Sequence, residues 1–199
     1  MGTTHAPVSQ RVATVNERAK YAEVSWEQKS TRQVYQNQWI SLREDIVELP
    51  NGRTTLYGVI TCSECVGVLP FLDPRTVLMI KQYRYVAKRV TWEMPTGGMH
   101  RGESAEAAAQ RELSEEIGYR AEKLTWLSTF HTSKSVVDET AHVFLGEALL
   151  NVELQPDETE FIEVRAFPFE DVLQMVLHSE ITDSMTIIAV LHAARLRGF

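Results

Sequence analysis

The sequence has neither a long apolar segment nor an excess of positive charge. No apolar run approaches the roughly 20 residues that a membrane-spanning helix needs, and residues 1–20 lack the apolar core of a signal peptide. The formal net charge is −7, which disfavours a nucleic-acid polymer as partner. We therefore expect a cytoplasmic protein that binds neither membranes nor nucleic acid. A small phosphate substrate stays compatible with this charge if the positive charge is local or carried by a metal.

Cysteine is scarce, with only Cys62 and Cys65 present. Their C-x-x-C spacing occurs in redox and zinc sites, but a structural zinc site needs two further Cys or His ligands at suitable spacing. No such ligands lie nearby in the sequence. The segment is also typical of a strand rather than of the start of a helix, so we expect two reduced cysteines with a structural role.

Internal repeats and low-complexity segments are absent too, which excludes solenoid and repeat architectures. A length of 199 residues suffices for one sizeable domain and a smaller appendage. The pattern predicts three parts: a flexible, polar tail over residues 1–21, a small antiparallel sheet over residues 22–60 and a main domain over residues 61–199.

The small N-terminal sheet is predicted from alternating apolar residues and one strong turn signal. Leu49-Pro50-Asn51-Gly52 is typical of a hairpin turn, with a strand from Trp39 to Leu49 before it and a return strand from Thr54 to Ile60. A further strand precedes Asn37.

The main domain mixes strands with helices. We predict strands near residues 65–70, 76–83, 124–130, 141–149 and 160–166, and helices near residues 104–117, 169–177 and 185–196. This order favours the α/β class, with a mixed sheet between layers of helices.

The helix near residues 104–117 carries a cluster of acids. Ser104 is a suitable N-cap and Gly118 a suitable stop signal. At 3.6 residues per turn, the side chains of Glu112, Glu115 and Glu116 fall within an arc of roughly 100°. Each pair of carboxylates about 5 Å apart repels by roughly 3 kcal/mol at an effective dielectric constant of about 20. A divalent cation would relieve that repulsion, and hard oxygen ligands suit Mg²⁺ or Mn²⁺.

An isolated acidic cluster is usually a solvated helix face, but this one belongs to a longer motif. The run from Gly97 to Tyr119 reads GGMHRGESAEAAAQRELSEEIGY, with glycines, arginine and glutamates at fixed spacing. It resembles the signature box of the Nudix hydrolases, metal-dependent enzymes that cleave a nucleoside diphosphate linked to another group. Segments outside the box, Lys81 to Tyr85, Trp92 to Pro95 and Thr182 to Thr186, resemble the ADP-ribose pyrophosphatase branch of that family.

The resemblance implies a role for each motif residue. Glu112 and Glu116 would hold Mg²⁺, or alternatively Mn²⁺, helped by Glu115 and the backbone carbonyl of Thr96. The remaining motif residues would brace the loop and the helix, with a salt bridge between the arginine and the first glutamate: Gly97, Glu103, Arg111 and Gly118.

Residues outside the motif would bind the substrate. Arg84 would contact a phosphate, since a guanidinium binds phosphate through two hydrogen bonds, or would instead be an ordinary surface arginine. Glu93 would bind substrate or anchor the loop before Gly97. Trp39, or Tyr35, would stack on a nucleobase or pack in the core or in a dimer.

The loop before residue 141 would supply the base that activates water. In the branch a glutamate of this loop has that role, which points to Glu139, with Asp138 and Glu115 as alternatives. ADP-ribose pyrophosphatases often carry Ser-Pro-Gly where this chain has Ser133-Lys134-Ser135. The charge of Lys134 would meet a terminal phosphate or another anionic group.

The resemblance as a whole implies a Nudix α/β/α sandwich, preceded by the small antiparallel sheet, that assembles as a homodimer. Its activity would be the Mg²⁺-dependent hydrolysis of a nucleoside diphosphate sugar, with ADP-ribose as the first candidate. GDP-sugars and dinucleoside polyphosphates remain alternative substrates. A different class, a sensor that binds a nucleotide sugar without cutting it, usually has a degraded box, whereas all three helix glutamates are present here.

Overall fold

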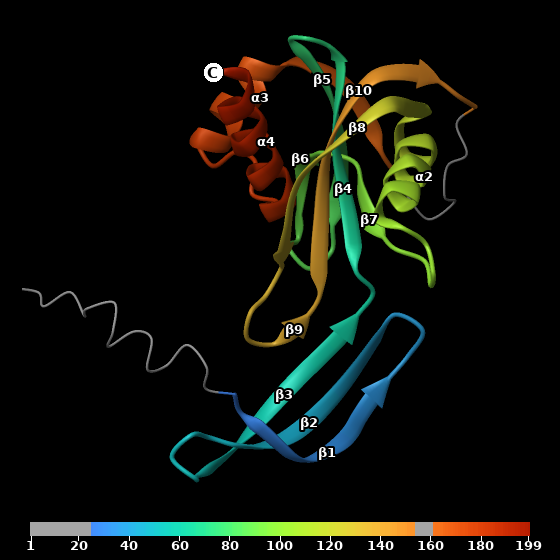
Figure 1. The fold of residues 1–199 in the computed structure, drawn as a ribbon. Coiled ribbons are helices and arrows are strands. Elements are labelled where there is room, and N and C mark those ends of the chain that lie inside the picture. Colours follow the sequence, from blue (N-terminus) through green and yellow to red (C-terminus); the bar gives the residue numbers. More distant parts are fainter. Residues whose placement is uncertain (1–24, 154–160) are drawn as a thin grey trace, which may run out of the picture.

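The computed structural model describes residues 25–153 and 161–199, and Figure 1 shows the fold. The predicted tail, residues 1–21, lies outside this part of the chain. None of the described helices is long and apolar enough to cross a membrane. The elements in chain order are β1 (Glu27–Gln36), β2 (Ile40–Glu48), β3 (Thr54–Cys62), β4 (Cys65–Asp73), β5 (Thr76–Arg84), β6 (Arg89–Glu93), β7 (Thr96–Gly98), α2 (Ala105–Ile117), β8 (Tyr119–His131), β9 (Val137–Asp138), β10 (Thr140–Asn151), β11 (Glu163–Pro168), α3 (Phe169–Leu177) and α4 (Ser184–Arg197).

Strands β1, β2, β3 and β9 form one sheet, called the front sheet below, at the lower end of the molecule in Figure 1. The pairs β1–β2 and β2–β3 are antiparallel, whereas the short β9 runs parallel to β3. The predicted hairpin turn joins β2 to β3, and Gly52 within it has a φ of 78°, which glycine adopts without steric cost. The predicted antiparallel N-terminal sheet is confirmed.

The second sheet, called the main sheet, has the strand order β11-β5-β4-β10-β8, with β6 paired to β5 and β7 paired to β4. Strands β4 and β10 are parallel and the other pairs are antiparallel. Helix α2 covers one face, and α3 and α4 cover the other (Figure 1). This arrangement is the α/β/α sandwich with a mixed sheet that the sequence predicts.

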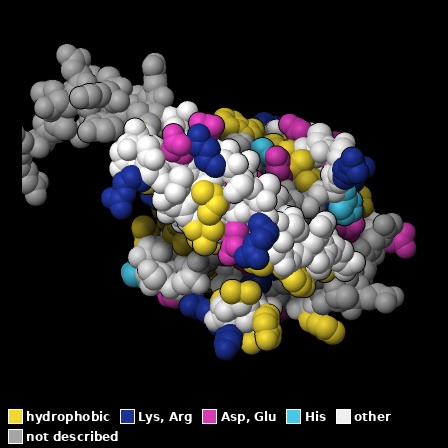
Figure 2. Space-filling model, turned by 90° about the horizontal axis from the view of Figure 1, so that it is seen from below, with side chains coloured by type: hydrophobic (Ala, Val, Ile, Leu, Met, Phe, Trp, Pro, Cys, Tyr) yellow, Lys and Arg dark blue, Asp and Glu magenta, His cyan; other side chains and the backbone are white. Residues whose placement is uncertain are grey.

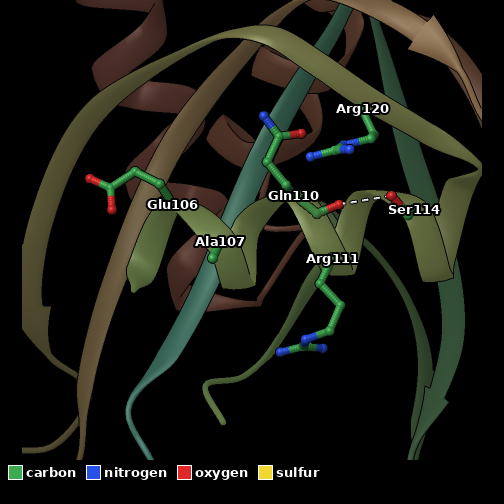
Figure 3. Close-up of a pocket in the computed structure, with 6 residues that line it drawn as sticks. All are labelled: Glu106, Ala107, Gln110, Arg111, Ser114 and Arg120. Atoms are coloured by element: carbon green, nitrogen blue, oxygen red, sulfur yellow. Dashed lines mark hydrogen bonds between the residues drawn. The ribbon is translucent and has the colours of Figure 1, made fainter. Parts of the chain in front are cut away.

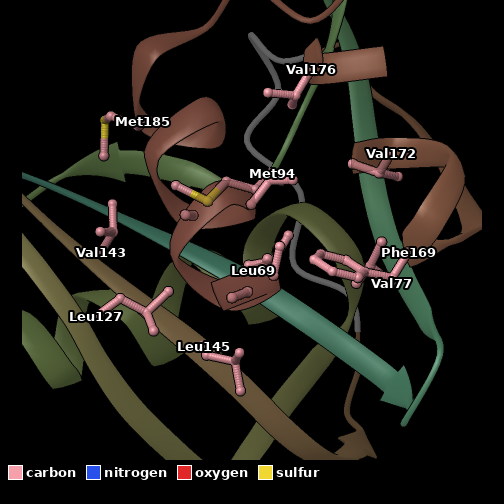
Figure 4. Close-up of a cluster of buried hydrophobic side chains, with 14 of the residues drawn as sticks. Leu69, Val77, Met94, Leu127, Val143, Leu145, Phe169, Val172, Val176 and Met185 are labelled. Carbon is pink, nitrogen blue, oxygen red and sulfur yellow. The ribbon is translucent and has the colours of Figure 1, made fainter. Parts of the chain in front are cut away.

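Alternating side chains of the main sheet fill a core on both of its faces. Leu69 and Val143 pack with Phe169 on the side of α3 and α4 (Figure 4), while Val68 and Phe144 pack beneath α2. Burying a side chain of this size contributes about 1.5–3 kcal/mol. The two clusters therefore hold β4 and β10 firmly, and residues at the ends of these strands gain fixed positions.

Helix α2 has the bounds that its capping residues predict. The Ser104 hydroxyl accepts a hydrogen bond from the Ala107 amide at 3.2 Å. At the other end Gly118 has a φ of 69°, and its amide donates to two carbonyls of the last turn. Leu113 and Ile117 are buried against the main sheet. Because this packing fixes the rotation of the helix, it also fixes the direction in which the acidic face points.

Three short strands, β6, β7 and β9, were not predicted. The first follows an irregular turn, the second is the run Thr96-Gly97-Gly98, and the third has only two residues. Glycine has low strand propensity, and runs this short carry no readable alternation. These three strands form because they make backbone hydrogen bonds to the longer strands β5, β4 and β3. All three border the candidate site.

Candidate active site

Two of the three α2 glutamates that the resemblance assigns to metal binding are buried beside strand β7. Glu112 is 6% exposed and Glu116 is 4% exposed, whereas Glu115 is only partly buried. The backbone amide of Thr96, on β7, donates to Glu116 Oε2 at 2.9 Å. Strand β7 is in turn held by β4, so helix and strand meet at these carboxylates.

Arg111 sits at the centre of this acidic group. Its guanidinium donates to Glu103 Oε2 at 3.0 Å, to Glu112 Oε1 at 2.6 Å and to Glu115 Oε2 at 2.9 Å. It also donates to the Gly98 carbonyl at 2.8 Å. Burial disfavours its charge, but the hydrogen bonds to Glu103 and Glu112 outweigh burial and raise the pKa of Arg111. One permanent cation thus ties the loop after β7 to α2.

Gly97 is required by its closeness to Glu112. A Cβ placed on Gly97 would lie 2.0 Å from Glu112 Oε1 and 2.2 Å from the carboxyl carbon, far inside contact distance. The backbone of β7 therefore passes directly beside the carboxylate. At Gly98, by contrast, an added Cβ would meet nothing within 4 Å. The Glu112 carboxylate occupies the space that a side chain at Gly97 would need. The corresponding space at Gly98 is open.

The donor groups collected here fit a hard divalent cation. Carboxylate oxygens, such as those of Glu112 and Glu116, are the ligands that Mg²⁺ and Mn²⁺ prefer. Within residues 25–153 and 161–199, however, no three Asp, Glu, His or Cys side chains converge closely enough to hold one ion. Arg111 engages Glu112 and Glu115 instead. The residues fit such an ion chemically. To bind it, Glu112 and Glu115 would give up their ion pairs with Arg111 and contact the metal ion instead.

Arg84 and Glu93 form an ion pair next to the motif. Arg84 Nε lies 2.8 Å from Glu93 Oε1, and Arg84 Nη2 lies 3.3 Å from Thr96 Oγ1. Glu93 is 2% exposed. Burial raises the pKa of Glu93, and the Arg84 guanidinium opposes that shift. Glu93 is therefore a direct partner of Arg84 in the structure.

A cavity of about 470 Å³ brings many of these residues together. It contains the predicted Arg84, Glu93 and Glu139 and the start of β7. Trp39, which is 73% exposed in the turn between β1 and β2, and the exposed Lys134 do not line it. Neither do the proposed metal ligands of α2, Glu112, Glu115 and Glu116. The complete lining is Cys65, Arg84, Ala87, Arg89, Thr91, Glu93, Thr96, Gly97, Glu139, Thr182, Asp183, Ser184 and Met185.

The two neighbouring loop acids differ in their surroundings. Asp138 is exposed and pairs with Thr61 of β3, whereas Glu139 is partly buried and lines the cavity. Cys62 Sγ donates to Glu139 Oε1 at 3.3 Å. Adjacent residues of an extended segment point to opposite sides, which explains why only one of the two acids faces inward.

Sequence reasoning missed Arg89, Asp183 and the contact of Cys62 with the loop acid. Arg89 stands directly opposite Arg84 in the β5–β6 pair, so recognition of that hairpin would have revealed it. Asp183 is the N-cap of α4 and accepts from the Thr186 amide at 2.7 Å. An N-cap aspartate followed by an apolar helix is a sequence signal that could have been used. No sequence signal links Cys62 to a residue 77 positions away.

A second cavity, of about 410 Å³, lies along the exposed side of α2 (Figure 3). The amide side chain of Gln110 binds both backbone groups of Ala121 there, at 2.7 and 3.0 Å. In Figure 3, Arg111 points away from Gln110 and Arg120. These contacts attach α2 to β8, and neither Arg84 nor Glu139 reaches this cavity.

Comparison with known proteins gives two family matches along the chain. The NUDIX domain model matches residues 63–185, and the model of the nucleoside diphosphate sugar hydrolase N-terminal domain matches residues 26–60. The second match covers most of β1, β2 and β3 of the front sheet, and the first begins just before β4.

Similar curated proteins cover most of the chain. An ADP-ribose pyrophosphatase of Bacillus subtilis is 39% identical over 160 residues, which span 79% of this chain and 86% of that protein. A methanol dehydrogenase activator of Bacillus methanolicus is 33% identical over 162 residues, with 80% and 88% covered. A GDP-mannose pyrophosphatase of Yersinia pestis is 32% identical over 126 residues, with 59% and 64% covered.

A solved structure described as an ADP compounds hydrolase superposes with a TM-score of 0.78 at 21% identity, covering 86% of this chain and 93% of that one. This likeness supports the fold. Together with the motif and the sequence matches, it shows that the chain belongs to the Nudix family and is a Nudix pyrophosphohydrolase. Nudix hydrolases generally use divalent metal ions, usually Mg²⁺.

Proposed function

We propose that this protein hydrolyses the pyrophosphate bond of a nucleoside diphosphate sugar, with ADP-ribose as the preferred substrate and Mg²⁺ as the cofactor. The products are a nucleoside monophosphate and a sugar phosphate. The observation that carries the proposal is the 470 Å³ cavity, in which Arg84, Arg89 and Glu139 surround the start of the motif at Gly97. The similar ADP-ribose pyrophosphatase of Bacillus subtilis supports the choice of substrate.

The diphosphate binds beside the two arginines in this proposal. Arg84 is held by Glu93 and Thr96, so its guanidinium is already oriented when the substrate arrives. Arg89 stands opposite it across the β5–β6 pair and adds a second cation to the same cavity. Guanidinium groups bind phosphate oxygens through paired hydrogen bonds, and preorganised ones lose less entropy on binding.

Glu112 and Glu116 would hold the cation, with Glu115 and the Thr96 carbonyl as further ligands. A bound Mg²⁺ would neutralise phosphate charge, orient the phosphates and lower the pKa of a coordinated water. The chain's own contribution is to bury two carboxylates beside Thr96 and Gly97, which line the cavity, with Gly97 leaving room for Glu112.

Glu139 takes the proton from the attacking water. The water oxygen bonds to one phosphorus, and the bond from that phosphorus to the bridging oxygen breaks. The leaving group departs as a phosphate monoester. Glu139 is favoured over Asp138 because it lines the cavity, and over Glu115 because Arg111 engages Glu115. Lys134 is an exposed residue of the same loop and would meet a terminal phosphate or another anionic group of the substrate.

A GDP-sugar is the second candidate substrate. The similarity to a GDP-mannose pyrophosphatase favours it, as does the Ser133-Lys134-Ser135 sequence in the loop. Trp39 is 73% exposed and does not line the cavity, so stacking on a base would need movement or a second subunit.

The front sheet serves as the interface of a homodimer in this proposal. Strand β1 is exposed along its whole length, and Tyr35 and Leu56 are more than half exposed. From the end of the molecule that carries this sheet, hydrophobic side chains are seen mixed with charged ones (Figure 2). A second copy would cover these side chains. Light scattering that gives a monomer mass at micromolar concentration would contradict this assignment.

A substrate panel tests the proposal. ADP-ribose, ADP-glucose, GDP-mannose, a dinucleoside polyphosphate and NADH are incubated with the protein and Mg²⁺, and phosphate-monoester products are measured. We expect the highest kcat/KM with ADP-ribose. A preference for GDP-mannose would move the assignment to the second candidate. Tight binding of a nucleotide sugar without any product would instead indicate a sensor.

A further inference from the structure

Glu139 lies in a segment that belongs to both sheets. The two-residue strand β9 pairs in parallel with the end of β3, through Ile60 with Val137 and Thr61 with Asp138. The Ile60 amide donates to the Val136 carbonyl at 2.9 Å. The next residue, Thr140, begins β10 of the main sheet. The front sheet therefore holds the loop up to the residue just before Glu139.

One side-chain hydrogen bond also links the front sheet to the carboxylate of Glu139. Cys62, the last residue of β3, donates from Sγ to Glu139 Oε1 at 3.3 Å. Both residues are partly buried, and Glu139 lines the 470 Å³ cavity. A carboxylate oxygen held in this way has fewer orientations available, and the second oxygen stays available for another contact.

The thiol is suited to act as a donor rather than as a nucleophile. Burial raises the pKa of Cys62 to about 11, and its hydrogen bond to Glu139 adds to that shift. The thiol therefore keeps its proton at neutral pH. Reactive cysteines show the opposite shift, towards a thiolate.

We propose that Cys62 is a positioning residue for the loop acid, so that the front sheet orients Glu139 towards the substrate within the same chain. This inference rests on the proposed function, in which Glu139 is the base. It gives the front sheet a role in turnover in addition to its role in association. It also assigns a specific task to a cysteine that the sequence marked only as structural.

The expected effect falls on kcat. A misdirected base slows proton transfer in the bound complex, whereas the arginines and the motif still bind the substrate. Cys62→Ala is expected to lower kcat on the order of 3- to 10-fold, the size expected for one neutral-donor hydrogen bond. KM and Tm are expected to stay close to their wild-type values.

A set of variants separates positioning from packing. Cys62→Ser keeps a donor and is expected to restore most of the kcat that Cys62→Ala loses. If Cys62→Ala does not fold, Cys62→Val is used instead, because valine fills the volume of the cysteine side chain without providing a hydrogen-bond donor. Ser63→Ala removes a hydroxyl from the next, exposed residue and is the matched control, with wild-type kinetics expected.

A double-mutant comparison completes the test. In a Glu139→Gln background the removal of the Cys62 donor is expected to cause no further loss, because the base it positions is already absent. The proposal is overturned if Cys62→Ala keeps wild-type kcat while Glu139→Gln is slow. It is equally overturned if the loss is the same in both backgrounds, or if serine does not restore it. Wild-type turnover in Glu139→Gln would instead refute the base assignment in the proposed function.

Discussion

The guanidinium of Arg84 is 2.8 Å from the carboxylate of Glu93, and Glu93 is almost completely buried. Glu93, the last residue of β6, pairs with Ile80, which precedes Arg84 on the same face of β5. The long Arg84 side chain therefore extends back along the strand pair to reach the carboxylate. Both residues line the 470 Å³ cavity, and the buried carboxylate holds the guanidinium in place there. In the proposed function, Glu93 contributes to substrate binding by orienting Arg84.

Replacement of Glu93 by glutamine is expected to weaken substrate binding. The amide keeps the size of the side chain but removes the charge that fixes Arg84. We expect KM to rise on the order of 10-fold, equivalent to about 1.4 kcal/mol, with a smaller change in kcat. Steady-state kinetics measure both parameters. Glu163→Gln, which breaks an exposed ion pair with Lys81 of the same β5, is the control. An unchanged KM in Glu93→Gln would show that Arg84 does not need its partner.

The two motif glycines are expected to respond differently to alanine. In Gly97→Ala the new Cβ would collide with the Glu112 carboxylate, whereas in Gly98→Ala it meets no atom within 4 Å. We therefore expect Gly97→Ala to need a Mg²⁺ concentration at least about 10-fold higher for half-maximal turnover, since a displaced ligand weakens metal binding. Gly98→Ala should follow the wild-type Mg²⁺ titration. Identical titration curves for the two variants would contradict the assignment of Glu112 as a ligand.

The two loop acids provide a matched pair of variants. Glu139→Gln is expected to lower kcat on the order of 100-fold or more, the usual contribution of a general base, with little change in KM. Asp138→Asn should stay near wild type, because Asp138 is exposed and lies outside the cavity. If Asp138→Asn is the slow variant instead, the base has been misplaced by one residue.

The cysteines are expected to be unreactive in the folded protein. Burial raises the pKa of Cys62 to about 11 and that of Cys65 to about 12. Unfolding returns both pKa values to about 8.5, so the thiolate fraction at pH 8 rises on the order of 100-fold for Cys62 and on the order of 1,000-fold for Cys65. Because the folded-state pKa values are raised, stability is lost as the pH rises from about 8.5 towards these values. Ellman's reagent at pH 8, with and without urea, measures the difference. Equal rates would show that the thiols are not buried as described.

Much of the fold was predictable because local signals agree with the tertiary structure. Ser104 and Gly118 mark the ends of α2, and Gly52 marks the β2–β3 turn. The strands β6, β7 and β9 were not predictable, since pairing across the sheets forms them rather than any pattern of their own.

The candidate site divides in the same way. Helix periodicity predicted that Glu112 and Glu116 share one face, because a single helix holds both residues. Arg89 depends on the register of β6, and the contact of Cys62 with Glu139 depends on how two sheets meet. The sequence could not show that Arg111 would engage two of the expected metal ligands, because its side chain could have taken several directions.

The most direct test of the account is to follow ADP-ribose by ³¹P NMR with wild-type protein and with Glu116→Gln, each with Mg²⁺ and with EDTA. Glu106→Gln, an exposed acid in the first turn of the same helix, serves as the control. We expect the diphosphate signals of ADP-ribose to be replaced by those of two phosphate monoesters, AMP and ribose 5-phosphate. This should occur only with Mg²⁺, in the wild type and in Glu106→Gln, while Glu116→Gln stays folded and inactive. Turnover in EDTA, near-wild-type turnover in Glu116→Gln, or release of ADP would contradict the account.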